Sequence, residues 1–342
     1  MRQSKLLHIE GIRAIAVMLV VFYHSGFDIL KGGFIGVDVF LVISGFLMSY
    51  TSFKTEKNFD VFNFYSKRFM RLYPQLAFML LTVSALTYFI FPPYLLSESA
   101  QSATAAILSI SNFYFLYQAD YFGSDSLVRP FIHTWSLGLE VQFYIIFGFI
   151  AAFFSRINVI MSIAVLSLVS FLINITVIND VKEVSYFLLP SRFWEFGVGS
   201  LLFFIPIVKE GSYNKSFSIL VVFSMVGLLY CAYFYNSGLL FPGYYALFPV
   251  IFTSFLILYT PRLPLLDYLL RHKLLVFLGG ISYGVYLWHQ PIFALIRVYS
   301  VGEPSLSLMI AAFLLSILIS YFFKVVIENR SHKFGFFDLR VI

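Results

Sequence analysis

Long apolar stretches alternate with short polar segments along most of this chain. A helix needs about 20 mainly apolar residues to cross a bilayer. The candidate spans are 11–29, 33–52, 69–91, 134–154, 158–178, 193–208, 217–235, 244–260, 274–295 and 306–327. The apolar stretch 103–118 is short and contains Ser109, Ser111, Asn112 and Gln118, so we expect it to be re-entrant and to pack against protein. The pattern predicts an all-α integral membrane protein with about ten transmembrane helices.

Composition supports a membrane protein and excludes several other classes. Hydrophobic residues make up 60% of the 342 residues and charged residues only 12%, whereas soluble domains carry about 25% charged residues. The single cysteine, Cys231, excludes a disulfide framework and a thiolate metal cluster, and no metal is expected. The net charge of +6 needs no nucleic-acid partner, because basic cytoplasmic loops account for it.

The distribution of basic residues predicts the orientation in the membrane. With ten spans and the N-terminus inside, seventeen of the 23 lysines and arginines fall in inside segments and five in outside segments. Treating 103–118 as a complete span would invert the later loops and remove this asymmetry. The positive-inside rule therefore favours ten spans with both termini cytoplasmic. The chain shows neither a linker nor a repeat, so we expect a single domain over residues 1–342.

The first span, "RAIAVMLVVFYH", carries a cation at one end and an imidazole at the other. Arg13 and His24 are eleven residues apart, which on an α-helix is about 1100°, three turns plus about 20°. The two side chains would therefore share one face, about 16 Å apart along the axis. Ionisable residues inside a span are costly and point to function.

Other polar groups at membrane depth fall into two sets. Near the outer ends of spans lie His24, Asp38 and the segments "HTWSLGLE" (133–140), "SRFWE" (191–195) and "YLWHQP" (286–291). At the cytoplasmic face, "SKRFMRLYP" places Arg68 and Arg71 on one helix face. Tryptophan beside carboxylates suits a carbohydrate, and paired arginines suit phosphates. A phosphate-bearing cytoplasmic donor and a hydroxyl-bearing outer acceptor would account for both sets.

Each residue also has a simpler interpretation when taken alone. His24 could be a hydrogen-bonded helix contact, and Asp38 could cap a helix or pair with a cation. Arg192 and Glu195 could form a local ion pair. The tryptophans could belong to interfacial belts, and the arginine pair could be ordinary positive-inside residues.

Six motifs, taken in their order along the chain, resemble those of the acyltransferase-3 family of integral membrane O-acyltransferases, and the resemblance covers nearly the whole chain. The R-x10-H pair, "GVDVFLVISGFL", "RFMRLYP", "TWSLGLEVQFY", "SRFWEFGVG" and "ISYGVYLWH" all match family segments. Two features depart from the family pattern. Val141 replaces a frequent second glutamate, and "VIENR" near the C-terminus lacks the usual proline.

The resemblance implies transfer of an acyl group, most simply acetyl, from acetyl-CoA to a hydroxyl of a glycan or glycolipid. His24 would be the general base, oriented by Glu140 or Asp38, since a reference pKa of about 6.5 suits proton abstraction near neutral pH. Arg68 and Arg71 would hold the CoA phosphates, with Arg13 between them and the base. The acceptor-site candidates are Trp135, Ser136, Arg192, Trp194, Glu195, Tyr286 and His289.

The same sequence leaves several alternatives open. Ten spans with buried charges also describe a secondary transporter of a small polar or anionic solute. A third hypothesis is a catalytically inactive relative that binds a glycan. Transfer could be direct or pass through an acyl-enzyme. The protein is expected in the bacterial cytoplasmic membrane, in contact with lipid, and a homo-oligomer is left open. Since the chain stops a dozen residues past its last span, we expect no appended soluble domain.

Overall fold

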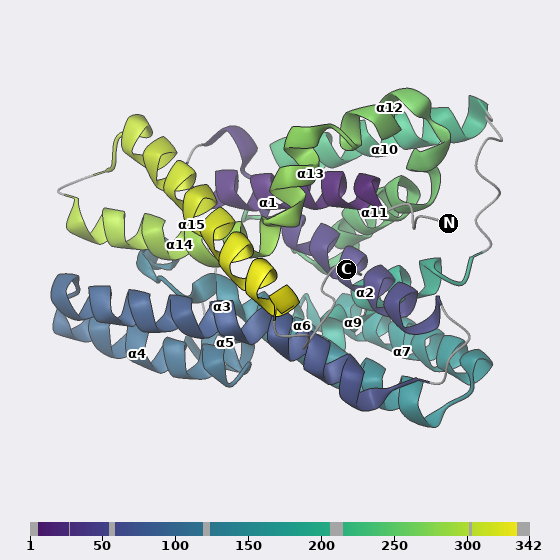
Figure 1. Ribbon diagram of the computed structural model, residues 1–342, viewed down its shortest axis with the longest axis horizontal. Helices are drawn as coiled ribbons and strands as arrows, with labels where there is room; N and C mark the ends of the chain where they lie inside the picture. Colours follow the sequence, from purple (N-terminus) through teal and green to yellow (C-terminus); the bar gives the residue numbers. More distant parts are fainter. Residues whose placement is uncertain are drawn as a thin grey trace. The chain divides into compact units, whose positions relative to one another are not determined.

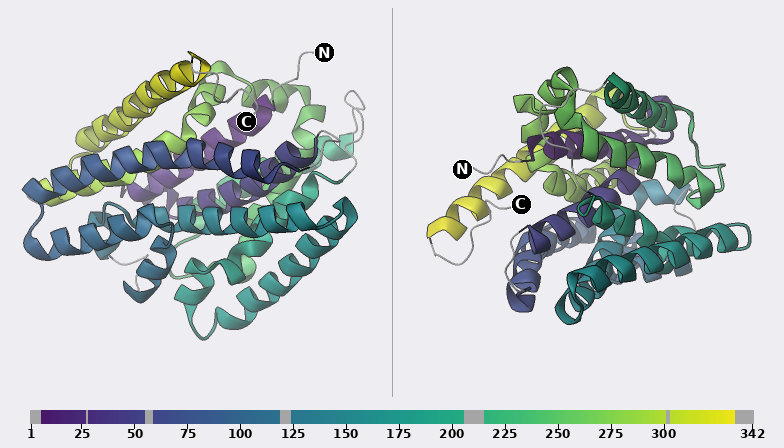
Figure 2. Two further views of the ribbon diagram at one scale, coloured as in Figure 1. Left: turned by 60° about the horizontal axis from the view of Figure 1, so that its bottom comes forward. Right: turned by 90° about the vertical axis from the view of Figure 1, so that its right-hand side faces the viewer.

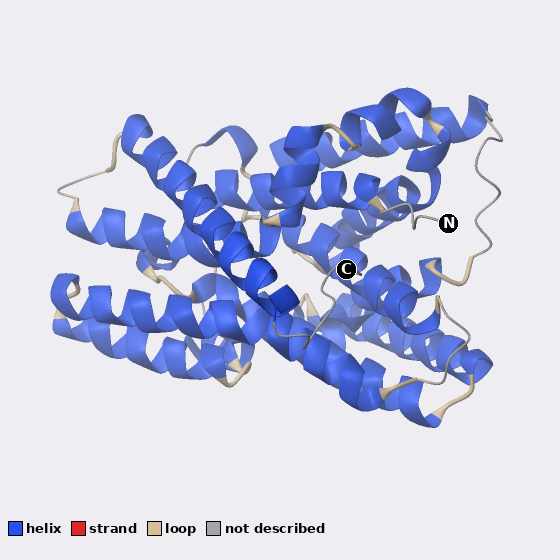
Figure 3. Cartoon of the chain, viewed as in Figure 1, coloured by secondary structure: helices blue, strands red, loops and turns tan. Residues whose placement is uncertain are grey.

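A computed structural model describes residues 6–26, 28–54, 59–118, 124–205, 215–300 and 303–333 of the chain. Within these ranges all regular secondary structure is helical (Figure 3). The described helices divide into two compact units, each assembled from separate stretches of sequence. The stretches of the two units alternate along the chain, so neither unit is a continuous piece of sequence. The expectation of a single domain over residues 1–342 stays a prediction.

Unit 1 consists of Met1–Lys54, Ser155–Tyr186 and Pro190–Ser282. Its helices are α1 (Leu7–His24), α2 (Gly36–Phe53), α7 (Arg156–Val177), α8 (Lys182–Phe187), α9 (Leu189–Leu202), α10 (Lys215–Phe234), α11 (Leu247–Tyr259), α12 (Pro264–Leu270) and α13 (Lys273–Gly280). In this unit α1 packs on α13 and α2, and α10 packs on α11 (Figure 1).

Unit 2 consists of Thr55–Phe154, Phe187–Leu189 and Tyr283–Ile342. Its helices are α3 (Val61–Ile90), α4 (Pro93–Ile107), α5 (Ser111–Gln118), α6 (Trp135–Phe153), α14 (Ser282–Tyr299) and α15 (Leu306–Lys333). The long helix α3 lies against α4 and α6, and α5 lies against α6 (Figure 2).

Seven described helices are long and apolar enough to cross a membrane, and the bent pair α11 and α12 would make an eighth. Most of the apolar window of α2 is buried (89%), whereas only 22% is buried in α15 and 28% in each of α7 and α10. Helices that are apolar on all sides but little buried by protein are covered by lipid. The protein is therefore a helical membrane protein, with α2 as a core helix of unit 1.

Two of the expected spans are shorter or broken in the structure. The stretch expected over 193–208 forms α9, whose 14 residues extend only about 21 Å. The stretch over 274–295 divides at Ile281 into α13 and α14. At Gly279 the backbone of α13 approaches Glu10 of α1 so closely that an added Cβ would lie 1.9 Å from the Glu10 carbonyl oxygen.

The expected re-entrant stretch 103–118 is also interrupted. It forms the end of α4 and all of α5, separated by Leu108–Ile110. Ser109 at the break has a φ of 57°, in the left-handed region. The interruption agrees with a stretch that is not one continuous span. Its depth in the membrane stays a prediction.

The number of spans and the cytoplasmic location of both termini stay predictions as well. Several basic residues that carried the orientation argument lie outside the described residues, namely Arg2, Lys5, Lys57, Lys209 and Arg340. The "VIENR" segment lies within α15, which runs on to Lys333. Without the family's proline, the helix has no residue that must end it there.

Candidate functional site

Helix α1 carries both Arg13 and His24 within one continuous helix. Both side chains are buried, Arg13 at 8% exposure and His24 at 4%. His24 is the last residue of α1, so its ring lies at the end of the helix next to the segment that leads into α2. A charged and a titratable side chain therefore stand about 16 Å apart along one helix, as the sequence predicted.

The ring of His24 is oriented by the backbone of its own helix. Its Nδ1 lies 3.0 Å from the Val20 carbonyl oxygen. A carbonyl oxygen can only accept a hydrogen bond, so Nδ1 carries the proton and Nε2 carries the lone pair of the neutral ring. Tyr23 packs edge-on against the same ring, with centroids 5.1 Å apart. In the neutral ring, Nε2 is therefore the nitrogen that can accept a hydrogen bond.

Arg13 has a partner that sequence reasoning did not assign. Its Nη1 donates to both carboxylate oxygens of Glu10, at 3.2 and 3.1 Å. Glu10 lies three residues earlier on the same helix face, so the spacing alone could have indicated the pair. The ion pair lowers the cost of placing an arginine inside an apolar helix.

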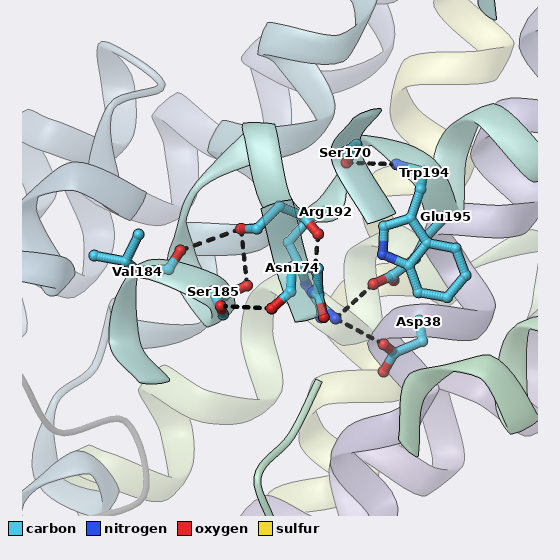
Figure 4. A network of polar contacts seen from close by, with 9 residues as sticks. Asp38, Ser170, Asn174, Val184, Ser185, Arg192, Trp194 and Glu195 are labelled. Carbon is cyan, nitrogen blue, oxygen red and sulfur yellow. Dashed lines mark hydrogen bonds and ion pairs between the residues drawn. The ribbon is translucent and has the colours of Figure 1, made fainter. Parts of the chain in front are cut away.

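Arg192 bonds to two carboxylates in the interior of unit 1 (Figure 4). Its Nη1 donates to Asp38 Oδ1 at 2.9 Å and to Glu195 Oε1 at 2.6 Å. All three residues have an exposure of 0%. The pair between Arg192 and Glu195 follows from their spacing in α9, but Asp38 comes from α2 and is 154 residues away. The orienting role of Asp38 toward His24 stays a prediction.

Hydrogen bonds also fix the chain around Arg192. The Asn174 side chain of α7 donates to the Ser191 carbonyl oxygen at 2.9 Å, and the Trp194 amide donates to Ser170 Oγ at 3.1 Å (Figure 4). The Trp194 ring is buried edge-on against Phe171. The first two turns of α9 are thus tied to α7.

In unit 2, Glu140 and Arg68 lie near each other. The Tyr144 hydroxyl donates to Glu140 Oε1. The charge of Arg68 interacts with Glu140, Tyr144 and Arg71, and its guanidinium lies over the Phe64 ring, 4.3 Å from the centroid. Arg68 is buried, whereas Glu140 and Arg71 are only half-buried.

This proximity differs from the sequence-based expectation, which put the arginine pair and Glu140 at opposite faces of the membrane. The reason is the start of α3 at Val61, eight residues before the expected span. Arg68 is therefore about 10 Å inside the helix. The Tyr65 hydroxyl donates to the Ile145 carbonyl oxygen at 3.1 Å, which aligns the start of α3 with the middle of α6.

A second polar group in unit 2 surrounds the Tyr286 hydroxyl. This hydroxyl donates to the His133 carbonyl oxygen at 2.7 Å and lies 2.6 Å from Ser136 Oγ. The His133 and His289 rings are 5.5 Å apart, and His289 Nδ1 lies 3.1 Å from the Val285 carbonyl oxygen. The Trp135 ring is buried against Phe187, 5.5 Å away and edge-on. Four of the acceptor-site candidates therefore lie in this unit.

The described residues contain no group of three or more histidine, cysteine, aspartate or glutamate side chains that could hold a metal ion. Sequence reasoning missed Glu10 and Tyr144 and gave His133, inside the segment 133–140, no role of its own. The spacings of three and four residues within one helix could have revealed Glu10 and Tyr144. Asn112 was also missed as a contact; it accepts from Gln142 at 2.9 Å and donates to the Phe187 carbonyl oxygen at 3.2 Å, and no local spacing indicates that link.

Comparison with known proteins identifies the family. The acyltransferase domain of the acyltransferase-3 family matches residues 6–325. O-acetyltransferase OatA of Staphylococcus aureus (strain NCTC 8325 / PS 47) is 30% identical over 96% of this chain and 57% of its own length. Peptidoglycan O-acetyltransferase OatA of Listeria monocytogenes serovar 1/2a is 29% identical over 96% of this chain and 56% of its own length.

The chain thus spans little more than half the length of these two relatives. No solved structure matches it. The family match, in contrast, covers nearly every described helix from α1 to α15. This chain belongs to the acyltransferase-3 family.

Proposed function

We propose that the protein is a membrane O-acetyltransferase that moves an acetyl group from acetyl-CoA to a hydroxyl of a cell-envelope glycan. The observation that carries this proposal is the acyltransferase-3 match over residues 6–325. The two relatives named as O-acetyltransferases, one of them acting on peptidoglycan, support acetyl as the group and a glycan as the acceptor. We place the protein in the bacterial cytoplasmic membrane with ten spans and both termini inside.

His24 is the proposed general base. A sugar hydroxyl is a poor nucleophile until its proton is removed. His24 Nε2, which carries the lone pair when Nδ1 donates to Val20, takes that proton. The sugar oxygen then forms its bond to the thioester carbon, the carbon–sulfur bond breaks, and the CoA sulfur leaves as a thiol with the proton returned by His24. The step balances without any further reactant.

Glu140 is the proposed carboxylate that stabilises the imidazolium, because a charged histidine needs a nearby anion in an apolar environment. Arg68 and Arg71 are proposed to bind the CoA phosphates, since guanidinium groups grip phosphates with paired hydrogen bonds. The half-buried position of Arg71 leaves it able to meet a ligand. Arg13 is proposed to contact the donor between these arginines and the base.

For the acceptor we propose the group around Tyr286 in unit 2. Trp135 is fully buried in the structure, and we propose that its indole packs against the apolar face of a sugar ring once the acceptor enters this group. Ser136, Tyr286 and His289 offer polar groups within one buried cluster. Sugar rings bind through such a combination of apolar faces and hydroxyl partners.

The test uses the purified full chain with radiolabelled acetyl-CoA and a peptidoglycan or exopolysaccharide fraction as acceptor. The informative variant is His24→Asn, because the asparagine amide can still donate to the Val20 carbonyl oxygen but cannot act as a base. We expect the transfer rate to fall about 10²–10⁴-fold. The matched control is His8→Gln, a buried histidine on the same helix, which should keep transfer.

Two outcomes would contradict the proposal in different ways. If His24→Asn transfers acetyl at the parent rate, His24 is not the base, although the proposed activity still stands. If the folded parent protein transfers no acetyl to either acceptor, the proposed activity is wrong. Uptake of a labelled anion into vesicles would then favour a transporter. Trapping of a labelled acetyl-enzyme with donor alone would replace direct transfer by a two-step route.

A further inference from the structure

The cluster of Asp38, Arg192 and Glu195 in unit 1 contains more negative than positive groups. Two carboxylates bond to one guanidinium nitrogen, at 2.9 and 2.6 Å. All three side chains have an exposure of 0%. If all three were charged, the cluster would hold one uncompensated negative charge in the interior of a membrane protein. Such a charge is strongly unfavourable unless a proton or a cation neutralises it.

The surroundings of the cluster offer no second cation among the contacts described. The Arg192 guanidinium lies between two aromatic rings, 5.5 Å from the Tyr186 centroid and 5.8 Å from that of Phe241. Two further titratable groups interact with Asp38, namely Cys231 of α10 and Tyr235, which directly follows α10. These groups are neutral or become anionic, so they cannot offset a carboxylate. A proton held by the two adjacent carboxyl groups would restore neutrality.

The helices that carry the cluster are packed with their backbones in contact. A Cβ added at Gly45 of α2 would lie 1.9 Å from the Phe196 carbonyl oxygen of α9. One added at Gly199 of α9 would lie equally close to the Val42 carbonyl oxygen of α2. Ser200 Oγ also donates to the Gly45 carbonyl oxygen at 3.0 Å. The cluster therefore joins two helices that cannot slide without breaking it.

The start of α2 connects the cluster to His24. The first residue of α2 and the turn before it lie directly on α1, because added Cβ atoms at Gly33 and Gly36 would lie 2.3 and 2.4 Å from the carbonyl oxygens of Leu19 and Ala16. Asp38 follows Gly36 by two residues. A shift of Asp38 would displace the segment that supports the last turns of α1, where His24 is found.

We propose that Asp38, Arg192 and Glu195 form a sealed cluster that holds one shared proton and positions His24 through the start of α2, without contacting the glycan. Arg192 and Glu195 are then positioning residues, in place of the acceptor contacts expected from the sequence. The kinetic part of this inference rests on the proposed function, whereas the shared proton and its effect on folding can be measured without any activity.

Infrared spectroscopy of the purified full chain tests the shared proton. A protonated carboxyl group absorbs separately from carboxylates, and its band shifts in D₂O. We expect one such carboxyl to disappear in Asp38→Asn and equally in Glu195→Gln, because either variant leaves one carboxylate balanced by Arg192. The control Asp180→Asn removes an exposed carboxylate in the turn after α7 and should leave the band intact. A band that survives at parental intensity in both cluster variants would overturn the shared proton.

Charge balance predicts how two further variants fold. Arg192→Met leaves two buried carboxylates without a cation, so we expect a large loss of folded protein in detergent. The triple variant Arg192→Met, Asp38→Asn, Glu195→Gln contains no charge in the cluster, and it should recover most of the folded fraction. If the triple variant folds no better than Arg192→Met, the charge-balance argument is wrong.

Kinetics of the folded fraction separate positioning from substrate contact. Arg192→Lys keeps the charge but loses the geometry of the two hydrogen bonds, so kcat should fall about tenfold with the KM for the glycan unchanged. A purely structural role would lower the folded fraction but leave kcat per folded molecule unchanged. A role in binding the glycan would raise its KM instead. Either of these last two results would overturn the positioning role, even if transfer itself is confirmed.

Discussion

At the scale of single residues, short contacts within helices orient several of the candidate site residues. His24 and His289 both direct Nδ1 at the carbonyl oxygen four residues earlier, at 3.0 and 3.1 Å. The same contact fixes the tautomer in each case and leaves Nε2 as the nitrogen with the lone pair. Glu10 and Tyr144 likewise contact Arg13 and Glu140 from one turn away on the same helix.

The contact between Tyr144 and Glu140 leads to one residue-level prediction. Tyr144→Phe removes the hydroxyl that donates to the Glu140 carboxylate, and we expect the rate of acetyl transfer to fall about tenfold because the carboxylate loses its orientation. The matched control is Tyr65→Phe, which loses a hydrogen bond to the Ile145 carbonyl oxygen and should alter stability alone. Equal rates in Tyr144→Phe and the parent would exclude this role for Tyr144.

A second residue-level prediction concerns the donor. Arg68→Lys keeps a positive charge but loses the planar group that binds phosphate through two parallel hydrogen bonds. We expect the KM for acetyl-CoA to rise about tenfold and the KM for the glycan to stay constant. The neighbouring Lys67→Ala serves as control. A rise in the glycan KM alone would place Arg68 at the acceptor and not at the donor.

At the scale of elements, glycine and helix breaks decide how closely the helices approach. Gly45 and Gly199 let the backbones of α2 and α9 touch, beside the Arg192 cluster, whose three side chains are fully buried. Gly279 does the same for α13 against α1. Serine in a left-handed conformation at position 109 separates α4 from α5. Breaks of this kind explain why some apolar stretches do not form full-length spans.

The α2–α9 contact gives an element-level prediction for stability. Gly45→Ala and Gly199→Ala each place a methyl group 1.9 Å from a backbone carbonyl oxygen, so the helices must separate. We expect a loss of about 1–3 kcal/mol in the free energy of unfolding, measured by thermal unfolding in detergent. Gly238→Ala, in an exposed turn where only the Asn236 side chain is near, is the control. Unchanged midpoints in both helix variants would contradict the packing.

At the scale of the whole molecule, the expected orientation in the membrane can be tested with thiol chemistry. Cys231 is the single cysteine of the sequence, so Cys231→Ser provides a background without cysteine. Asn236→Cys and Asp180→Cys lie in exposed segments expected outside, and His272→Cys lies in one expected inside. An impermeant maleimide should label the first two in intact cells and the third only after permeabilisation. Labelling of His272→Cys in intact cells would contradict the ten-span topology.

Much of the fold and of the site could be predicted because it depends on local patterns. Apolar runs predicted an all-helical membrane protein, and the R-x10-H spacing placed Arg13 and His24 on a single helix, as α1 shows. The lengths of α9 and α13 could not be predicted this way. Hydropathy measures whether a segment tolerates lipid, and it does not reveal where backbone contacts or paired glycines end a helix.

Composition, periodicity and motif order are properties of the chain alone, and they were enough to predict the class of protein, the family and the residue types available for acyl transfer. Which of these residues come close together is visible only in the folded molecule. Arg192 joins Asp38 across 154 residues, and Arg68 lies near Glu140 although the sequence placed them at opposite faces. Such contacts depend on how separate helices pack, and packing depends on the three-dimensional fit of side chains that no local spacing records.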